Sequence, residues 1–197
     1  MQHGYQPGFD PRGIAQNYIT SSGMPFQQRM NALFAAADIQ RDGFLSVTEV
    51  QRSFAQGASA VSISIEASKS LMRLFDSPNA PGQGVIDQSE FIMLNAFVES
   101  LRMVYANYAG NISAPAMNAQ SMQPALASLG LVLTPVSVQN LVRIFASSNP
   151  TVVTYLQFLE ICIHTALCLS LHTRFAGGSE RASLSADQML AFSLFFK

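Results

Sequence analysis

The chain contains no tryptophan, two cysteines among its 197 residues, and only 12 % charged residues, about half of the usual share. Lys and Arg number 11 and Asp and Glu number 12, which gives a formal net charge of −1. Nucleic acids are bound through basic patches, so this balance argues against a nucleic-acid partner. The two cysteines, Cys162 and Cys168, are six residues apart on an expected helix, roughly 9 Å in rise and too far for a disulfide. Reduced cysteines predict a cytoplasmic location.

Long hydrophobic runs are absent as well. The longest apolar stretch, 156–171, is interrupted by Glu160 and His164, so no run reaches the ~18 residues of a membrane span. The N-terminus lacks a basic start followed by an apolar core, and no secretory signal is visible. Hydrophobic residues nevertheless make up 49 % of the chain, enough for a sizeable core in one large domain or two small ones.

The most informative stretch runs from Asp38 to Glu49 and has the spacing of an EF-hand calcium loop. Ca²⁺ takes six to eight oxygen ligands, which a loop of about 12 residues supplies from fixed positions. Gly43 stands at position 6, where the sharp turn needs a positive φ, and Leu45 stands at the apolar position 8. Gln40 replaces the usual acid at position 3, which lowers the expected affinity. The alternative is an acidic turn that binds no ion. The expected ligands are Asp38, Gln40, Asp42, the carbonyl of Phe44 and Glu49, with Ser46 at position 9 of the loop.

A second loop of this type, Asp76 to Glu90, is three residues too long when counted from its first acid. Asp76, Asp87 and Glu90 could form a weaker, non-standard calcium site. The role favoured by the sequence is structural, with Ile86 pairing with Leu45 in a short β bridge between the two loops.

Three further loops lack the acids that an ion needs. In the third, Gly110 and Ile112 match positions 6 and 8, but no carboxylate accompanies them. The fourth keeps Val153 at position 8 and has Gln157 at position 12, and the fifth, around Leu184, is poor in acids. We expect helix–loop–helix form in these loops and little affinity for a cation.

Helical periodicity begins at about residue 25. Residues 1–24 are rich in Gly, Pro, Gln, Tyr and Asn and are expected to form a flexible tail; the alternative is a short ordered arm that packs on the domain. Residues 25–197 are expected to form one all-α domain of five EF-hand-like helix–loop–helix units, with short β bridges between paired loops. The expected helices cover 25–37 and about 47–56, 65–75, 88–107, 116–129, 135–145 and 155–175, with a last helix after Ser185.

Five units that recur about every 35 residues resemble the penta-EF-hand family, the family of sorcin, grancalcin and the calpain small subunit. The strongest local matches are 38–49, Leu74-Phe75-Asp76 and Ser89-Glu90-Phe91. The resemblance implies pairing of hands one and two and of hands three and four, and a homo- or heterodimer through the fifth hand. It also implies calcium sensing, which in this family rests on loops one and three and sometimes on loop two. Because the third loop here has no acid, we expect any calcium response to come from the N-terminal half.

The end of the chain supports a dimer independently, because its apolar side chains need a covering partner. The alternative is that the last helix folds into its own core. The expected interface residues are Leu184, Met189, Phe192, Phe195 and Phe196.

Glu160, His164, Cys168 and His172 recur every four residues and include metal-ligand types. On one helix the outer members lie ~12–18 Å apart and cannot share an ion. No oxyanion loop accompanies the His–Cys pair, so we expect no catalytic residues and no enzyme.

The sequence therefore predicts a calcium-responsive cytoplasmic adaptor. Ion binding in the first loop would present an apolar groove to a protein or peptide ligand, with peripheral membrane association as a further expectation. The alternative is a calcium-insensitive structural or regulatory subunit of a heterodimer.

Overall fold

The computed structural model describes residues 9–56, 61–76, 84–111, 116–146 and 148–176. Helices dominate them, and among them no helix is both long enough and apolar enough to cross a bilayer. The elements are α1 (Pro11–Ala37), β1 (Leu45–Ser46), α2 (Val47–Gln56), α3 (Ile65–Phe75), β2 (Val85–Ile86), α4 (Gln88–Ala109), β3 (Met117–Asn118), the 3₁₀ helix η1 (Ala119–Ser121), α5 (Met122–Ser128), α6 (Pro135–Phe145), β4 (Val152–Val153) and α7 (Tyr155–Ala176).

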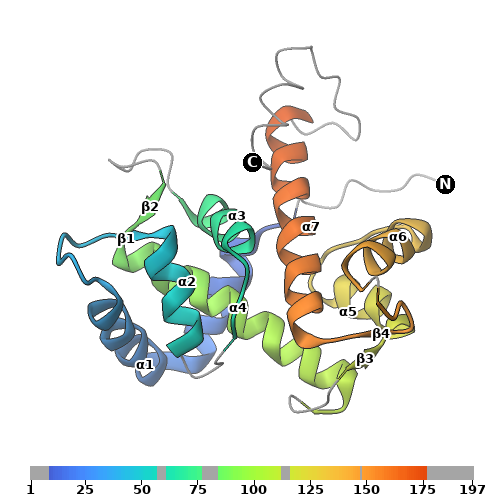
Figure 1. Cartoon of the computed structure of the whole chain (residues 1–197), viewed down its shortest axis with the longest axis horizontal. Coiled ribbons are helices and arrows are strands. Elements are labelled where there is room, and N and C mark those ends of the chain that lie inside the picture. Colours follow the sequence, from blue (N-terminus) through green and yellow to red (C-terminus); the bar gives the residue numbers. More distant parts are fainter. Residues whose placement is uncertain (1–8, 57–60, 77–83, 112–115, 147, 177–197) are drawn as a thin grey trace.

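The helices form two groups, each joined by a two-residue antiparallel β bridge (Figure 1). In the first group Leu45 pairs with Ile86, as the sequence predicted, and both side chains are fully buried. The second bridge joins β3 to β4. Helix α4 crosses from one group to the other, and α7 stands between them and packs on α3, α4 and α6.

Local sequence signals set most helix boundaries. Helices α2 and α3 have the predicted bounds. Helix α6 begins as predicted, with Pro135 in its first turn and the Thr134 hydroxyl accepting a hydrogen bond from the backbone N–H of Ser137. Helix α4 runs two residues further than expected, to Ala109, and the next residue, Gly110, has a φ of 87°, a left-handed value that suits glycine.

The expectation of a flexible tail over residues 1–24 is wrong from residue 11 onward. Helix α1 begins at Pro11, capped by the carboxylate of Asp10, and continues through a kink at Gly23 (φ 65°, ψ −158°). Ala15 is fully buried and Ile19 is 8 % exposed, so this stretch is the packed arm that the sequence left as the alternative. Its polar composition hid three apolar positions, 11, 15 and 19, spaced four residues apart on one helix face.

The third loop also differs from the prediction. Met117, rather than Ile112, pairs with Val153 across the second bridge. Ile112 lies outside the described residues. The predicted helix over 116–129 is replaced by β3, η1 and the short α5. Counted from Met117 at position 8, the third loop runs from 110 to 121 and still contains no carboxylate.

Tyr105 joins α4 to the second bridge. Its ring is fully buried against Tyr155 and Phe158 of α7, with ring centroids 5.2 and 5.6 Å away. Its hydroxyl donates to the carbonyl of Val153 at 3.4 Å. Burial raises the pKa of Tyr105, while a backbone hydrogen bond from Met117 lowers it. One side chain therefore contacts both strands of the bridge.

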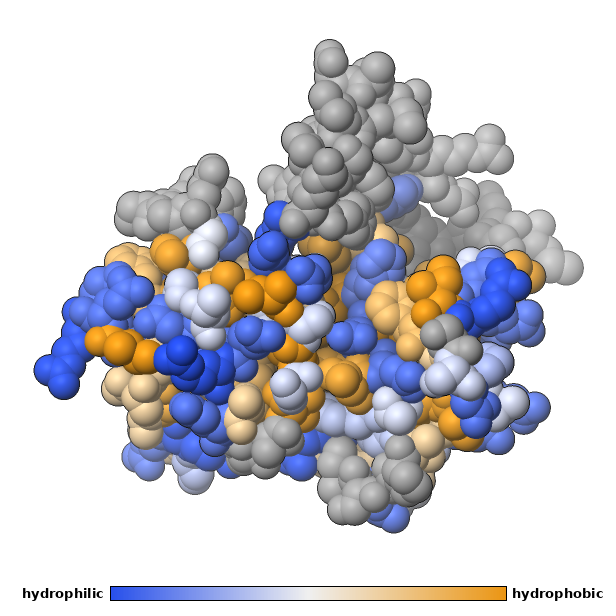
Figure 2. Space-filling view, viewed as in Figure 1, coloured by the Kyte–Doolittle hydropathy of each residue, from blue (hydrophilic) through white to orange (hydrophobic). Residues whose placement is uncertain are grey.

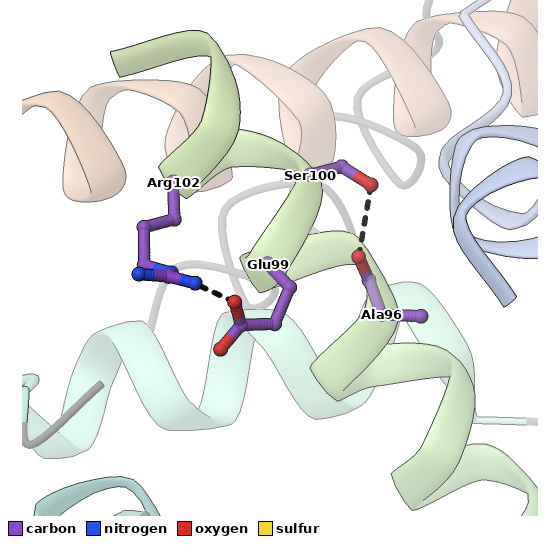
Figure 3. A network of polar contacts seen from close by, with 4 residues as sticks. All are labelled: Ala96, Glu99, Ser100 and Arg102. Carbon is purple, nitrogen blue, oxygen red and sulfur yellow. Dashed lines mark hydrogen bonds and ion pairs between the residues drawn. The ribbon is translucent and has the colours of Figure 1, made fainter. Parts of the chain in front are cut away.

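Two polar contacts lie on different sides of α4 (Figure 3). Arg102 donates from Nε to Glu99 at 2.7 Å, and Ser100 donates to the carbonyl of Ala96 at 2.9 Å. Glu99 is only 6 % exposed. A buried charge needs a partner, and here the ion pair with Arg102 supplies it. The hydroxyl of Tyr155 is buried and has no hydrogen-bond partner among the described residues. Burial, followed by the charge of Glu99, raises its pKa.

Candidate calcium loop and its capping contacts

The first loop begins where α1 ends, and the carboxylate of Asp38 organises its turn. Asp38 Oδ1 accepts from the backbone N–H of Asp42 at 3.2 Å, and Oδ2 accepts from that of Gly43 at 3.0 Å. Gly43 has a φ of 83°, the left-handed value expected at position 6. The predicted position-1 acid therefore already holds the loop in a tight turn.

The middle of the loop is exposed to solvent. Asp42 Oδ1 accepts from the N–H of Phe44 at 2.9 Å, and the side chains of Gln40 and Asp42 are both exposed. Arg41 adopts a positive φ of 56°, which is unfavourable for a side chain of its size. The loop thus holds a left-handed residue that glycine would tolerate better, and the carboxylate contacts on either side of it maintain that conformation.

Glu49, the predicted position-12 ligand, is buried and fully engaged. Its Oε2 accepts from the backbone N–H of Ser46 at 2.9 Å and from the Ser46 hydroxyl at 2.6 Å, and its Oε1 accepts from the N–H of Ile39 at 3.3 Å. These bonds, those from Ser46 first, lower the pKa of Glu49 even though burial raises it. The carboxylate is therefore charged and ties the end of the loop back to its beginning.

The same contact recurs in other loops. Glu90 accepts from the N–H of Asp87 at 3.0 Å, and Asp87 accepts from the N–H of Glu90 at 2.9 Å, which is a complete capping box on α4. In the fourth loop Gln157 accepts from the N–H of Thr154 at 2.9 Å at the start of α7. Position 12 therefore serves helix capping in three loops. The fourth loop fills it with a neutral amide, which also accepts the capping hydrogen bond and lacks the charge that an ion needs.

Two acids of the second loop, Asp76 and Glu90, interact across it. Burial raises the pKa of Asp76, the charge of Glu90 raises it further, and Arg12 lowers it. Asp76 also follows the last residue of α3, where a negative charge faces the negative end of the helix dipole. Residues 77–83 lie outside the described part of the chain, so the arrangement of Asp76, Asp87 and Glu90 around a cation stays a prediction.

The donor types and spacing of the first loop fit Ca²⁺, but its carboxylates are occupied by local contacts. Within the described residues, no group of three or more Asp, Glu, His or Cys side chains is gathered as a metal site. Asp38 binds the turn, Asp42 binds Phe44, and Glu49 binds Ser46 and Ile39. An ion would have to draw Glu49 from its capping position toward the other donors.

Of the four residues spaced along α7, His164 and Cys168 lie close together. His164 Nε2 lies 3.7 Å from Cys168 Sγ, and the His164 ring packs at 5.6 Å from that of Phe145. Burial lowers the pKa of His164 and raises that of Cys168. A protonated thiol is a poor nucleophile, so burial works against activation of the Cys168 thiol. The predicted dimer residues Leu184, Met189, Phe192, Phe195 and Phe196 lie outside the described residues.

The sequence reasoning missed two features. The capping role of position 12 was visible in Ser46-Val-Thr-Glu49 and its counterparts, which have the spacing of a capping box. The contact of Arg12 with the end of α3 joins residues 63 and 64 positions apart, and no local pattern predicts it.

The surface near α6 is partly apolar. A cavity of about 530 Å³ lies between η1, α5, α6 and the fourth loop and is lined by Gln120, Gln123, Pro135, Val138, Arg143 and Pro150 among others. Val132, Val136 and Ile144 near it are 65 to 69 % exposed. The face shown in Figure 2 carries apolar side chains in several separate places among polar ones.

No known protein family and no curated protein matches this sequence. Among solved structures, a homologue of programmed cell death 6 protein from Leishmania major Friedlin has a TM-score of 0.56 and 18 % identity, over 87 % of this chain and 96 % of that chain. A redox protein from Chlamydomonas reinhardtii has a TM-score of 0.38 and 14 % identity, over 84 % of this chain and 61 % of that chain, and this likeness supports no argument. The first likeness speaks for a shared, EF-hand-like fold and for nothing finer.

Proposed function

We propose that this chain is a calcium-responsive adaptor that binds Ca²⁺ mainly through its first loop. The observation that supports the proposal is the turn in which Asp38 accepts hydrogen bonds from the N–H groups of Asp42 and Gly43. A calcium loop needs an acid at position 1 and a sharp turn at position 6. The residues that would hold the ion are Asp38, Gln40, Asp42, the carbonyl of Phe44 and Glu49.

Glu49 supplies the link between the ion and the fold. It is the third residue of α2, and its carboxylate is held by Ser46 and Ile39. Ligation would exchange these bonds for the ion and draw the first turn of α2 toward the loop. The angle between α1 and α2 would change, and with it the apolar surface that the two helices enclose.

The adaptor part of the proposal concerns partners. A protein or peptide ligand is the partner that exposed apolar groups such as Val132, Val136 and Ile144 suit. We propose dimerisation through the fifth unit, a cytoplasmic location and, on calcium binding, peripheral membrane association as further parts of the same hypothesis.

A second function, a calcium-insensitive structural or regulatory subunit of a heterodimer, is favoured by a different observation. The position-12 residues Glu49, Glu90 and Gln157 all act as helix caps. Selection for folding alone would therefore retain an acceptor at this position, and the third and fourth loops have no carboxylate with which to bind an ion.

Calorimetric titration of Ca²⁺ into the metal-stripped chain distinguishes the two functions. The adaptor hypothesis predicts one site of about micromolar affinity that is lost in Glu49→Gln, a variant that keeps the capping acceptor. The Gln157→Glu chain is the matched control, because it adds a carboxylate at the same position of a loop without other acids and is expected to add no site. Absence of heat and of any shift in melting temperature would refute calcium binding and favour the subunit. Two sites would show that Asp76–Glu90 also binds.

A further inference from the structure

Residues 9–22, which include the first half of α1, pack on the rest of the molecule and are set off from the second half of α1 by a kink. The kink at Gly23 has a φ and ψ that only glycine adopts without strain, and Pro25, two residues later, has no backbone N–H to continue the helix. The helical hydrogen-bond ladder is therefore broken between 9–22 and the helix that leads into the calcium loop. The two halves are joined by a hinge at Gly23, and the rings of Tyr18 and Phe26 pack across it with centroids 5.2 Å apart.

The inner face of this segment is short and follows one helical stripe. Pro11, Ala15 and Ile19 are buried, and Phe9 packs edge-on against Phe97 of α4, with ring centroids 6.3 Å apart. The opposite face is polar and exposed: Gln16, Asn17, Thr20 and Ser21. Ile14 and Tyr18, beside this stripe, are partly buried and also pack against the core. The segment is therefore an amphipathic helix whose apolar side lies on the body of the molecule.

Its polar anchor is Arg12. Arg12 Nη2 donates to the carbonyl of Phe75 at 2.6 Å and to that of Asp76 at 3.3 Å. These carbonyls belong to the C-terminal end of α3, which lacks helical N–H partners and favours a cation. Phe75 also packs against Phe97 at 5.6 Å. The surface covered by residues 9–22 thus combines the aromatic rings of Phe75 and Phe97 with the carbonyl acceptors at the end of α3.

We propose that residues 9–22 are a detachable cover on a helix-docking surface formed by α3 and α4. When the cover swings away at Gly23, the surface receives an amphipathic helix from a protein partner. The present occupant defines the chemistry of that helix: an aromatic residue, an arginine three positions on, then small and branched apolar residues, at the spacing of Phe9, Arg12, Ala15 and Ile19. The inference rests on the proposed function for the premise that a protein partner exists, and it requires no ion.

Hydrogen exchange of the full chain, in the presence of a calcium chelator, tests whether the cover opens by itself. We expect amides 12–22 to exchange at least about tenfold faster than amides 27–37 of the same helix, and Arg12→Gln to accelerate only the former. Equal protection of the two halves, or an Arg12→Gln effect spread over all helices, would overturn the proposal.

A second measurement tests the surface itself. The probe is a labelled synthetic peptide of residues 9–22, added to full-length chains whose own cover is intact or released. Ile19→Asp places a charge on the buried stripe and releases the cover, while Asn17→Asp places the same charge on its exposed face. We expect the peptide to bind the Ile19→Asp chain at least about tenfold more tightly than the wild-type and Asn17→Asp chains, and an Arg12→Ala peptide to bind more weakly.

Equal binding to all three chains, or to none of them, would overturn the proposal. Self-association of the wild-type chain that Ile19→Asp abolishes, without peptide binding to the Ile19→Asp chain, would overturn it in favour of exchange of the segment between two copies. Loss of the calcium response in the calorimetric titration would leave these outcomes unchanged, so failure of the proposed function and failure of the cover can be told apart.

Discussion

Glu49 accepts two hydrogen bonds from Ser46, one from its backbone N–H at 2.9 Å and one from its hydroxyl at 2.6 Å. The residue with the strongest claim to bind calcium is therefore also the residue that caps α2 in the absence of an ion. Its two roles need different chemistry, because a cap needs an acceptor and an ion needs a charge. Substitutions at this position can separate them.

We expect Glu49→Ala to lower the free energy of unfolding by about 1 kcal/mol, the usual effect of losing a helix cap, and Glu49→Gln to lower it much less. Gln157→Ala removes the corresponding cap from α7 and should cost a similar amount. Urea unfolding of the metal-free proteins measures all three. Equal losses for Glu49→Ala and Glu49→Gln would mean that the charge of Glu49, rather than its capacity to accept hydrogen bonds, stabilises the fold at this position.

The depressed pKa of Glu49 predicts an acid-dependent loss of stability. A carboxyl whose pKa is lower in the folded state stabilises the fold above its unfolded pKa and loses that effect as the pH falls through the folded value. The wild-type chain should therefore lose stability more steeply than Glu49→Gln as the pH falls through and below 4.5, the ordinary pKa of this carboxyl. Urea midpoints recorded across this range provide the measurement. Parallel pH profiles for the two proteins would contradict the role assigned to the Ser46 bonds.

Asp76 should behave in the opposite way. Its pKa is raised by burial and by Glu90, so its charged form destabilises the fold at neutral pH. Asp76→Asn is expected to raise the melting temperature at pH 7, and the gain should shrink as the pH falls below the raised pKa, where the wild-type acid is already neutral. Glu66→Gln, at an exposed acid of α3, the helix that ends just before Asp76, is the control and should change the melting temperature little. A lower melting temperature for Asp76→Asn would show that its charge has a favourable partner.

Two tyrosines at the α4–α7 contact offer a matched pair. The hydroxyl of Tyr155 is buried without a partner among the described residues, whereas that of Tyr105 donates to Val153. Removing an unpaired buried hydroxyl relieves a desolvation cost, and removing a paired one loses about 1 kcal/mol. Tyr155→Phe should thus be neutral or stabilising and Tyr105→Phe destabilising, as measured by thermal unfolding. A larger loss of stability for Tyr155→Phe than for Tyr105→Phe would show that the hydroxyl of Tyr155 has a hydrogen-bond partner.

The first β bridge is expected to hold the two N-terminal loops together. Leu45 and Ile86 are fully buried opposite one another, so Leu45→Ala should lower stability by about 2–5 kcal/mol. Thr48→Ala, at an exposed residue of the same helix–loop junction, is the control. Differential scanning calorimetry compares the two. A loss below about 1 kcal/mol for Leu45→Ala would mean that the site collapses around the smaller side chain.

The sequence by itself determined the features that depend on neighbouring residues. Capping residues and glycine set the bounds of α2, α3 and α6, and the position-8 rule predicted the pairing of Leu45 with Ile86. The donor order of the first loop was visible for the same reason, since every ligand position lies within twelve residues. The capping contacts of Glu49 could have been read from the same short pattern.

Tertiary structure decided what depends on distant residues. A β bridge selects its partner by packing as well as by spacing, and buried Met117 rather than Ile112 lies opposite Val153. Residues 11–22 look like a tail in sequence because three apolar positions are a weak signal. They become a packed helix only because α3 and α4 supply an aromatic floor and free carbonyls for Arg12. The free energy of such contacts arises between segments that no local pattern connects.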